Sequence, residues 1–399
     1  MVLLKRDILM DRKKDVIKDW FAKEKWSVAV LLIAAVLFLA LRLYAADHTE
    51  QSAQSGDYAE YEKATVTEII SDTTQKDESS DGAMRGEQKI TVRVDSGQYK
   101  GEILLADNFV GPLYGVPLKK GDSAVLIINT YANGDLRATV YEYNRTYALF
   151  AVLLIFFGIT AAVGGKTGLK SFIALMITAA VLFGILIPLL IKGFPTLPAV
   201  FAACIYITAV SLTIIGGLHR KTICAMLGTA AGTAFAMLFG IFAQNFCRID
   251  GMRTSDVEPL LQLRQSGVPI GLSGLLTAGI IISALGAVMD VAMSISSSLE
   301  EVHAANPSLT TKELFASGMN IGRDMVGTMT NTLILAFIGS GFTLILYLFS
   351  LGLSFWQLSS SAYVSVEAIS ALASSAGMIL AIPLTALISS ALLSRDHTV

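Results

Sequence analysis

The uneven distribution of charge along the chain is the feature that most limits its fold. From Thr146 to Val399, 254 residues carry eleven Lys/Arg and ten Asp/Glu, and these charges lie mostly between long apolar runs. Soluble domains have about 25% charged residues, whereas the whole chain has 16%. Because a soluble fold could not bury so much apolar surface, the sequence predicts a polytopic α-helical membrane protein.

Eight apolar segments approach the length of about 20 helical residues that crosses ~30 Å of hydrocarbon. The first follows a basic amino-terminal segment, 1–25, and Arg42 near its end can extend its side chain to the interface. Cleavage after Ala45-Ala46, as in a signal peptide, is the alternative interpretation. The other seven form a bundle over 146–394. We predict helices at 26–46, 146–163, 171–191, 198–217, 223–244, 270–294, 325–350 and 365–393.

The basic residues between these segments predict an orientation. Lys and Arg are enriched in cytoplasmic loops of membrane proteins. If the first segment is retained, the basic loops all fall on one side, so both ends of the chain are expected in the cytoplasm. The basic residues on this side belong to 1–25, Lys166, Lys170, Arg220, Lys221 and the short tail 395–399.

Residues 47–145 have a different composition and are predicted to lie outside, between the first two helices. They hold seventeen Asp/Glu against ten Lys/Arg and contain no apolar run of membrane length. Short β-branched segments alternate with turn signals such as Asn133-Gly134-Asp135, a pattern typical of a small closed or half-closed β-barrel. The expected strands are 65–70, 89–94, 101–105, 124–128 and 136–143.

Small residues recur at four-residue spacing in two of the predicted helices. Small side chains let helix backbones approach closely inside a membrane, so tight helix packing is the favoured interpretation. A substrate path along this stripe is the alternative. The glycines assigned to helix packing are Gly228, Gly232, Gly240, Gly279 and Gly286.

The densest polar region of the bundle runs from Gly286 to Thr332. Ionisable residues inside a membrane are costly and often mark a pathway, and we expect Asp290 to pair with Arg323. Thr310 and Glu313 form a capping-box pattern that predicts a short amphipathic helix before the next span. The candidates for a substrate or ion pathway here are Asp290, Ser294, Arg323, Asp324, Gly327, Thr328 and Asn331.

Structural roles explain the same residues at least as well. Asp324 fits the first turn of a helix, where the helix dipole favours negative charge. Arg323 can interact with lipid headgroups, and Asp290 can lie at the membrane interface. A docking surface for a partner is a third interpretation of this region.

Glu367 is the last pathway candidate. It begins a polar stripe in the final segment that continues through Ser370, Ser374 and Gly377, before Pro383 interrupts the helical pattern. A carboxylate on a serine-lined stripe is suited to bind a proton or a cation. Placement of Glu367 at the outer interface is the equally weighted alternative, because 365–393 exceeds one minimal span.

The sequence offers little for other kinds of chemistry. It has no nucleotide-binding loop, no G-x-S-x-G motif and no H-E-x-x-H motif. The three cysteines and four histidines show no metal-ligand spacing, and no basic tract indicates nucleic acid. We therefore expect no enzymatic activity, no cofactor and no metal.

The stretch from Gly286 to Phe337 resembles the YibE/F-like family of bacterial membrane proteins. The resemblance rests on GAVMDVAMSISSSLEEV and SGMNIGRDMVGTMTNTLILAF, and on SAGMILAIPLTALIS after Glu367. It implies a leading helix, an extracytoplasmic β-rich segment and a helical bundle in a bacterial cytoplasmic membrane. In the family pattern a basic residue follows the Glu by three positions, where this chain has Ser370, so a fixed ion pair at Glu367 is not expected.

Two functions fit these features. The first is a transporter or permease for a small solute or ion. The second is a non-transporting membrane subunit, such as a sensor or assembly component, that binds a partner through the outer β-domain. The expected partners are the lipid bilayer, a small solute or ion, and a second copy of the chain or another membrane protein.

Overall fold

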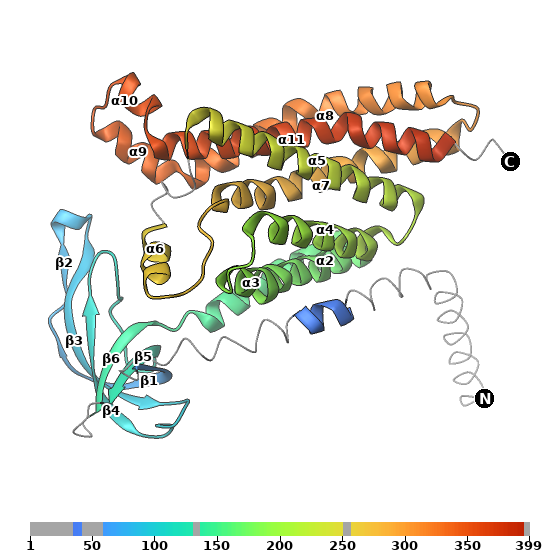
Figure 1. Cartoon of the computed structure of the whole chain (residues 1–399). Coiled ribbons are helices and arrows are strands. Elements are labelled where there is room, and N and C mark those ends of the chain that lie inside the picture. Colours follow the sequence, from blue (N-terminus) through green and yellow to red (C-terminus); the bar gives the residue numbers. More distant parts are fainter. Residues whose placement is uncertain (1–34, 42–58, 131–135, 250–256, 395–399) are drawn as a thin grey trace, which may run out of the picture. The chain divides into compact units, whose positions relative to one another are not determined.

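The computed structural model describes residues 35–41, 59–130, 136–249 and 257–394 (Figure 1). The chain divides into two compact units. One falls within residues 50–163, and the other comprises 1–49 together with 164–399. The first unit contains a β-barrel and the start of a long helix, and the second is entirely helical in its described part.

The β-barrel closes through five long strands. The hydrogen-bonded order is β1-β5-β6-β4-β3, and β3 pairs back with β1. Strands β4 and β6 are parallel, whereas the neighbouring pairs are antiparallel. This is the strand order of the OB-fold, a five-stranded Greek-key barrel, and it confirms the predicted small barrel. The strands are β1 (Ala59–Asp72), β2 (Gln75–Asp77), β3 (Ala83–Val94), β4 (Ile103–Val110), β5 (Ser123–Thr130) and β6 (Leu136–Tyr143).

Alternation of side chains explains the barrel core. In β3, Ile90, Val92 and Val94 are buried while Lys89 and Arg93 are exposed, because successive side chains of a strand point to opposite faces. The interior is filled by alanine and larger aliphatic residues from every long strand and from the loop at Leu118. The core residues are Ala64, Val66, Ile90, Val92, Val94, Ala106, Leu118, Ala124, Leu126, Ile128 and Ala138.

A buried amide pair fixes the long loop after β4 to the barrel. Asn108 Nδ2 donates to Gln88 Oε1 at 2.9 Å and to the Val116 carbonyl at 3.0 Å. Gln88 Oε1 also accepts from the Leu118 backbone N–H at 2.8 Å, and Gln88 Nε2 donates to the Leu118 carbonyl at 3.2 Å. Since unsatisfied buried amides are costly, this network holds the segment from Val116 to Leu118 in one position.

The barrel is expected to lose stability in acid, in part through Asp72. The Thr74 hydroxyl and backbone N–H and the Gln88 amide donate to the Asp72 carboxylate and hold its pKa below the ordinary value of 3.8. A depressed pKa contributes stability above the unfolded-state pKa, and this contribution is lost as pH falls through the folded-state pKa. Urea unfolding of residues 59–145 should show this loss below pH ~4. The Asp72→Asn variant should have a flatter pH dependence, and an unchanged slope would contradict this role.

The helical unit begins inside a long helix that starts in the first unit. Gly165 has φ 54° and ψ −132°, so α2 consists of two helices joined at this residue. A π-helical turn at 182–186 links it to α3. The helices are α2 (Thr146–Val181), α3 (Ile187–Ile191), α4 (Thr196–Gly216), α5 (Arg220–Cys247), α6 (Val257–Gln265), α7 (Leu275–Ala305), α8 (Thr311–Ser340), α9 (Phe342–Ser350), α10 (Phe355–Ser359) and α11 (Ala362–Leu393).

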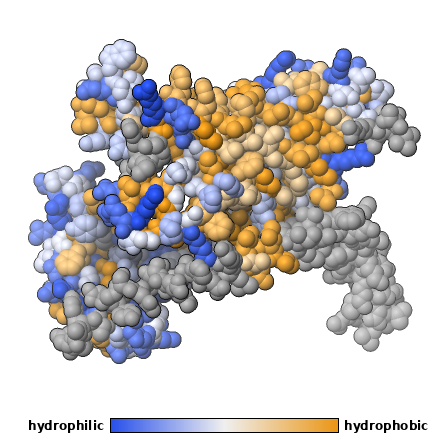
Figure 2. All heavy atoms as spheres, viewed as in Figure 1, coloured by the Kyte–Doolittle hydropathy of each residue, from blue (hydrophilic) through white to orange (hydrophobic). Residues whose placement is uncertain are grey.

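Five helical stretches in the described part are long and apolar enough to cross a membrane, or six if α8 and α9 form one bent span. Many of their large apolar side chains point outward, among them Phe242 and Phe246 of α5. Figure 2 shows apolar residues over much of the helical surface. The predicted class of protein, a multi-pass helical membrane protein, is thus supported, but the predicted number of eight spans is not confirmed.

Several helix boundaries differ from the prediction. The capping box at Thr310 and Glu313 forms, but the helix that it starts is not short, because α8 continues unbroken to Ser340. The break falls instead at Gly341, inside the segment 325–350 that was predicted to be one helix. Residues 166–170, predicted as a loop, are helical and follow the break at Gly165. Most of the first predicted helix, 26–46, lies outside the described residues.

Close backbone packing of α5 against α7 and α11 forms the centre of the bundle. An added Cβ at Gly232 would lie 2.7 Å from both Ala381 Cβ and Val288 Cγ1, and one at Gly240 would lie 3.1 Å from Ile280 Cδ1. Gly228 directly faces Thr385. In contrast, Gly279 and Gly286 have open space around the Cβ position, so they do not make the close helix contacts expected of them.

Candidate functional site

The polar residues of α8 lie on the face of the helix that points away from the bundle. Gly318 and Gly322 are buried against Leu299 and Ile382, whereas the polar residues on the opposite side of α8 are exposed. The described residues therefore do not enclose a pathway along this face. The exposed candidates are Arg323, Asp324, Gly327, Thr328 and Asn331.

The expected pair between Asp290 and Arg323 is not formed. Arg323 Nη1 donates to Asn320 Oδ1 of its own helix at 3.2 Å. Asp290 and Ser294 are exposed on α7, and Asp290 makes no ion pair with any residue that the structure describes. The structure also corrects the interpretation of Asp324 as a first-turn acid, because α8 begins at Thr311 and places Asp324 near its middle.

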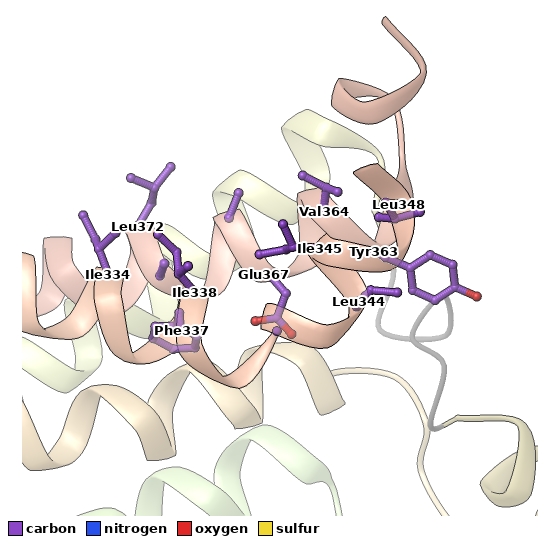
Figure 3. A pocket seen from close by; sticks show the side chains of 13 residues that line it. Ile334, Phe337, Ile338, Leu344, Ile345, Leu348, Tyr363, Val364, Glu367 and Leu372 are labelled. Carbon is purple, nitrogen blue, oxygen red and sulfur yellow. The ribbon is translucent and has the colours of Figure 1, made fainter. Parts of the chain in front are cut away.

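Of the predicted pathway residues, Glu367 is the one that lines the cavity near the start of α11. The cavity has a volume of about 320 Å³ and is formed by the end of α8, by α9 and by the first turns of α11. Figure 3 shows the Glu367 side chain between Phe337 and Ile338 on one side and Leu344 on the other. The lining residues are Ile334, Phe337, Ile338, Gly341, Leu344, Ile345, Leu348, Tyr363, Val364, Glu367, Ala368, Ala371 and Leu372.

A break in the helix shapes this cavity. Helices α8 and α9 meet at an angle of 62°, with Gly341 between them. An added Cβ on Gly341 would lie 3.6 Å from Glu367 Cγ, so the break is packed directly against the glutamate.

A second cavity lies on the other side of Glu367. It has a volume of about 460 Å³, and Phe337 and Glu367 line both cavities. Ser340 and Ser370 add hydroxyl groups to the second cavity, which is otherwise lined mainly by apolar residues of α6, α7 and α11. Among the described residues that line the two cavities, Glu367 is the sole carboxylate, and none of them is Lys, Arg or His.

The serines that follow Glu367 lead into the packed core. Ser370 and Ser374 are buried, and Ser374 Oγ lies 2.9 Å from Ser283 Oγ of α7. One turn further, an added Cβ on Gly377 would lie 2.5 Å from Ala236 Cβ, so no open path continues along the stripe in this conformation. The structure therefore brings Glu367 and Ser370 to cavity edges and places Ser374 and Gly377 at a helix contact.

Sequence reasoning missed the apolar half of the site. Phe337, Leu344 and Ile345 look like ordinary lipid-facing residues in a span predicted to be continuous. The signal that could have revealed the break is the pair Gly339 and Gly341 in the middle of that span, since glycine weakens a helix interior.

Comparison with known proteins supports assignment of the chain to one protein family. A family model described as YibE/F-like protein matches residues 152–395, which is more than half of the 399-residue chain. The match begins inside α2, covers the helices from there to the end of α11 and leaves the strands outside its range. No curated protein and no solved structure matches the chain significantly.

Proposed function

The chain belongs to the YibE/F-like family, and we propose that it is a transporter that moves a small solute or ion across a bacterial cytoplasmic membrane. One observation carries this proposal. A carboxylate, Glu367, lines an apolar cavity of about 320 Å³ beside a broken helix pair in a unit of membrane-length helices.

Broken helices and membrane carboxylates both have a physical connection to transport. Many transporters bind substrate where a transmembrane helix is interrupted, because the interruption leaves backbone groups that do not complete the helical hydrogen-bond pattern. An ionisable residue within a span is costly and usually faces a cavity or a pathway. Glu367 and the break at Gly341 combine the two features in one place. The negative charge of the carboxylate favours a cationic solute or a proton.

The proposed orientation has eight spans with both termini in the cytoplasm. The stretch Thr146–Ile191 has 46 residues and would be ~69 Å long as a straight helix, more than twice the hydrocarbon thickness. Two spans meeting at Gly165 account for this length. Together with 26–46, the bent pair α8–α9 as one span and the four other span-length helices, this gives eight.

Labelling of single cysteines in intact cells tests the orientation. Lys100 of the barrel and Lys166 beside the α2 break are both exposed. In a chain without other cysteines, a membrane-impermeant maleimide should label Lys100→Cys in intact cells, and should label Lys166→Cys after the cells are opened. The reverse pattern would show that the orientation is inverted.

A partner-binding membrane subunit is the second candidate, and one feature of the barrel favours it. Ile103, Leu105 and Phe109 are exposed on the outer face of β4, with exposed fractions of 67%, 58% and 45%. By strand order, β3 and β4 correspond to the second and third OB-fold strands, whose face commonly binds ligands. Exposed apolar rows of this kind often mark interaction sites.

Reconstitution of the purified chain separates the two functions. A transporter gives flux in liposomes that contain only this chain, above the leak of protein-free liposomes. A subunit gives no flux alone and co-purifies with a stable partner. Liposomes loaded with a pH-sensitive dye measure proton flux, and uptake of radiolabelled Na⁺, K⁺ and tetraethylammonium, offered in turn, measures cation flux.

A further inference from the structure

The barrel is joined to α2 by two residues, and this short connection fixes one end of the barrel near a membrane. Strand β6 ends at Tyr143 and α2 begins at Thr146. Asn144 is buried, donates to Ser123 Oγ at 3.0 Å and accepts from the Thr146 backbone N–H at 3.1 Å. Apolar residues are exposed from the first turns of α2, including Tyr147 and Phe150. The hydrocarbon that α2 enters therefore begins within a few residues of the barrel.

A tight apolar turn projects from this same end of the barrel. Gly111 and Tyr114 pair across the turn, with the Gly111 N–H donating to the Tyr114 carbonyl at 2.8 Å. At its tip Leu113 has 95% of its surface exposed, and Tyr114 has 64%. The Gly115 N–H donates to Glu142 Oε1 at 3.2 Å, which places the turn beside the end of β6.

Backbone pairing of Gly111 with Tyr114 closes the turn, and contacts with the barrel fix the chain that follows it. The segment that follows it, Val116 to Leu118, is bound to the barrel through Gln88 and Asn108. A rigid turn presents its apolar tip without the cost of ordering a flexible chain on binding. With 95% of its surface exposed, Leu113 contributes nothing to the barrel core and is free to make an external apolar contact.

We infer that the turn 111–115 is a membrane anchor that inserts Leu113 and Tyr114 into the leaflet that α2 enters at Thr146. Aliphatic side chains bury into the acyl boundary, and tyrosine is favoured at the interface because its ring is apolar and its hydroxyl is polar. The contact is continuous with the membrane surface that the first turns of α2 already occupy. With the turn and α2 as two attachment points, the barrel is held in one orientation on the bilayer.

Spin labels on the full-length chain test this inference. Leu113→Cys and Ile103→Cys are made in a chain whose Cys204, Cys224 and Cys247 are replaced by serine, and each is labelled with a nitroxide and reconstituted in liposomes. Ile103 is a matched control, because it is an exposed aliphatic residue on β4, ~20 Å along the strand from Phe109.

Collision rates with oxygen, which concentrates in lipid, and with a water-soluble nickel chelate give the depth of each label. We expect the ratio of oxygen to nickel collisions to be several-fold higher at position 113 than at 103. Equal, water-like ratios at the two positions would overturn the inference. If Leu113→Cys does not fold, Tyr114→Cys takes its place with the same two outcomes.

Discussion

Replacement of Gly232 by valine is expected to destabilise the helical unit more than any other single change considered for the bundle. Gly232 lies where α5 meets α7 and α11, and even a Cβ there would lie 2.7 Å from Ala381 Cβ and Val288 Cγ1 and 3.1 Å from the Gly377 carbonyl oxygen. Backbone atoms cannot rotate away as a side chain can. Overpacking of a close-packed interior costs about 1–3 kcal/mol and occasionally more, and Gly232→Val should reach the upper part of this range.

The matched control for this substitution is Gly286→Val. Gly286 is also in the interior of a long helix, but nothing lies within 4 Å of its Cβ position. Both variants carry the same cost of a β-branched residue in a helix, so the difference between them isolates the packing contact. Thermal unfolding of the purified chain in detergent should show a clear decrease in melting temperature for Gly232→Val and little change for Gly286→Val. Equal decreases would mean that close approach at Gly232 does not matter.

The amino-acid pattern predicted the strands of a small barrel and most of the helices. Alternation of apolar and polar residues in segments such as 89–94 predicted the strands, because one face of each strand fills the barrel interior. The strand order was not predictable, since the pairing of β1 with both β3 and β5 depends on contacts between distant residues. Long apolar runs likewise predicted α4, α5, α7 and α11 to within a few residues, except where α7 extends through a polar end to Ala305.

The break at Gly341 was the main structural feature that hydropathy could not locate, because it interrupts a segment whose apolar character is nearly uniform. The break at Gly165, in contrast, falls within two residues of the predicted helix end at 163, where glycines and Lys166 interrupt the apolar run. For the polar candidates of α8, the sequence could not predict the direction in which their face of the helix points. Periodicity correctly placed Asp324, Gly327 and Asn331 on one face of a helix, but it could not tell whether that face points into the bundle or away from it. That depends on Gly318 and Gly322, whose close contacts set the rotation of α8.

The candidate site was therefore predictable in part. Glu367 was identified because a carboxylate in a long apolar segment stands out, whereas the cavity around it depends on the fold of three helices. Asp290 stood out for the same reason, yet α7 places it on an exposed face away from any described ion pair. Its role in transport, and that of the exposed α8 residues, stays a prediction.

Replacement of Glu367 by glutamine is expected to reduce cation or proton flux by about tenfold or more, equivalent to ~1.4 kcal/mol for each factor of ten. Glutamine keeps the size and hydrogen-bonding capacity of the side chain but removes its negative charge and its titration. No other carboxylate lines either cavity among the described residues, so none is in place to take over the role. Folding should be little affected, because glutamine has nearly the same size and shape as glutamate.

Comparison of Glu367→Gln with Glu301→Gln in one flux assay is the most direct test of the proposed transport site. Glu301 is an exposed carboxylate near the end of α7, outside both cavities, so the two variants lose the same charge at different places. Each is purified, checked for an unchanged melting temperature and reconstituted in liposomes loaded with a pH-sensitive dye. We predict that Glu301→Gln keeps the flux of the original chain and that the flux of Glu367→Gln is lower by about tenfold or more. Full flux through Glu367→Gln, or no flux through the original chain, would contradict this prediction.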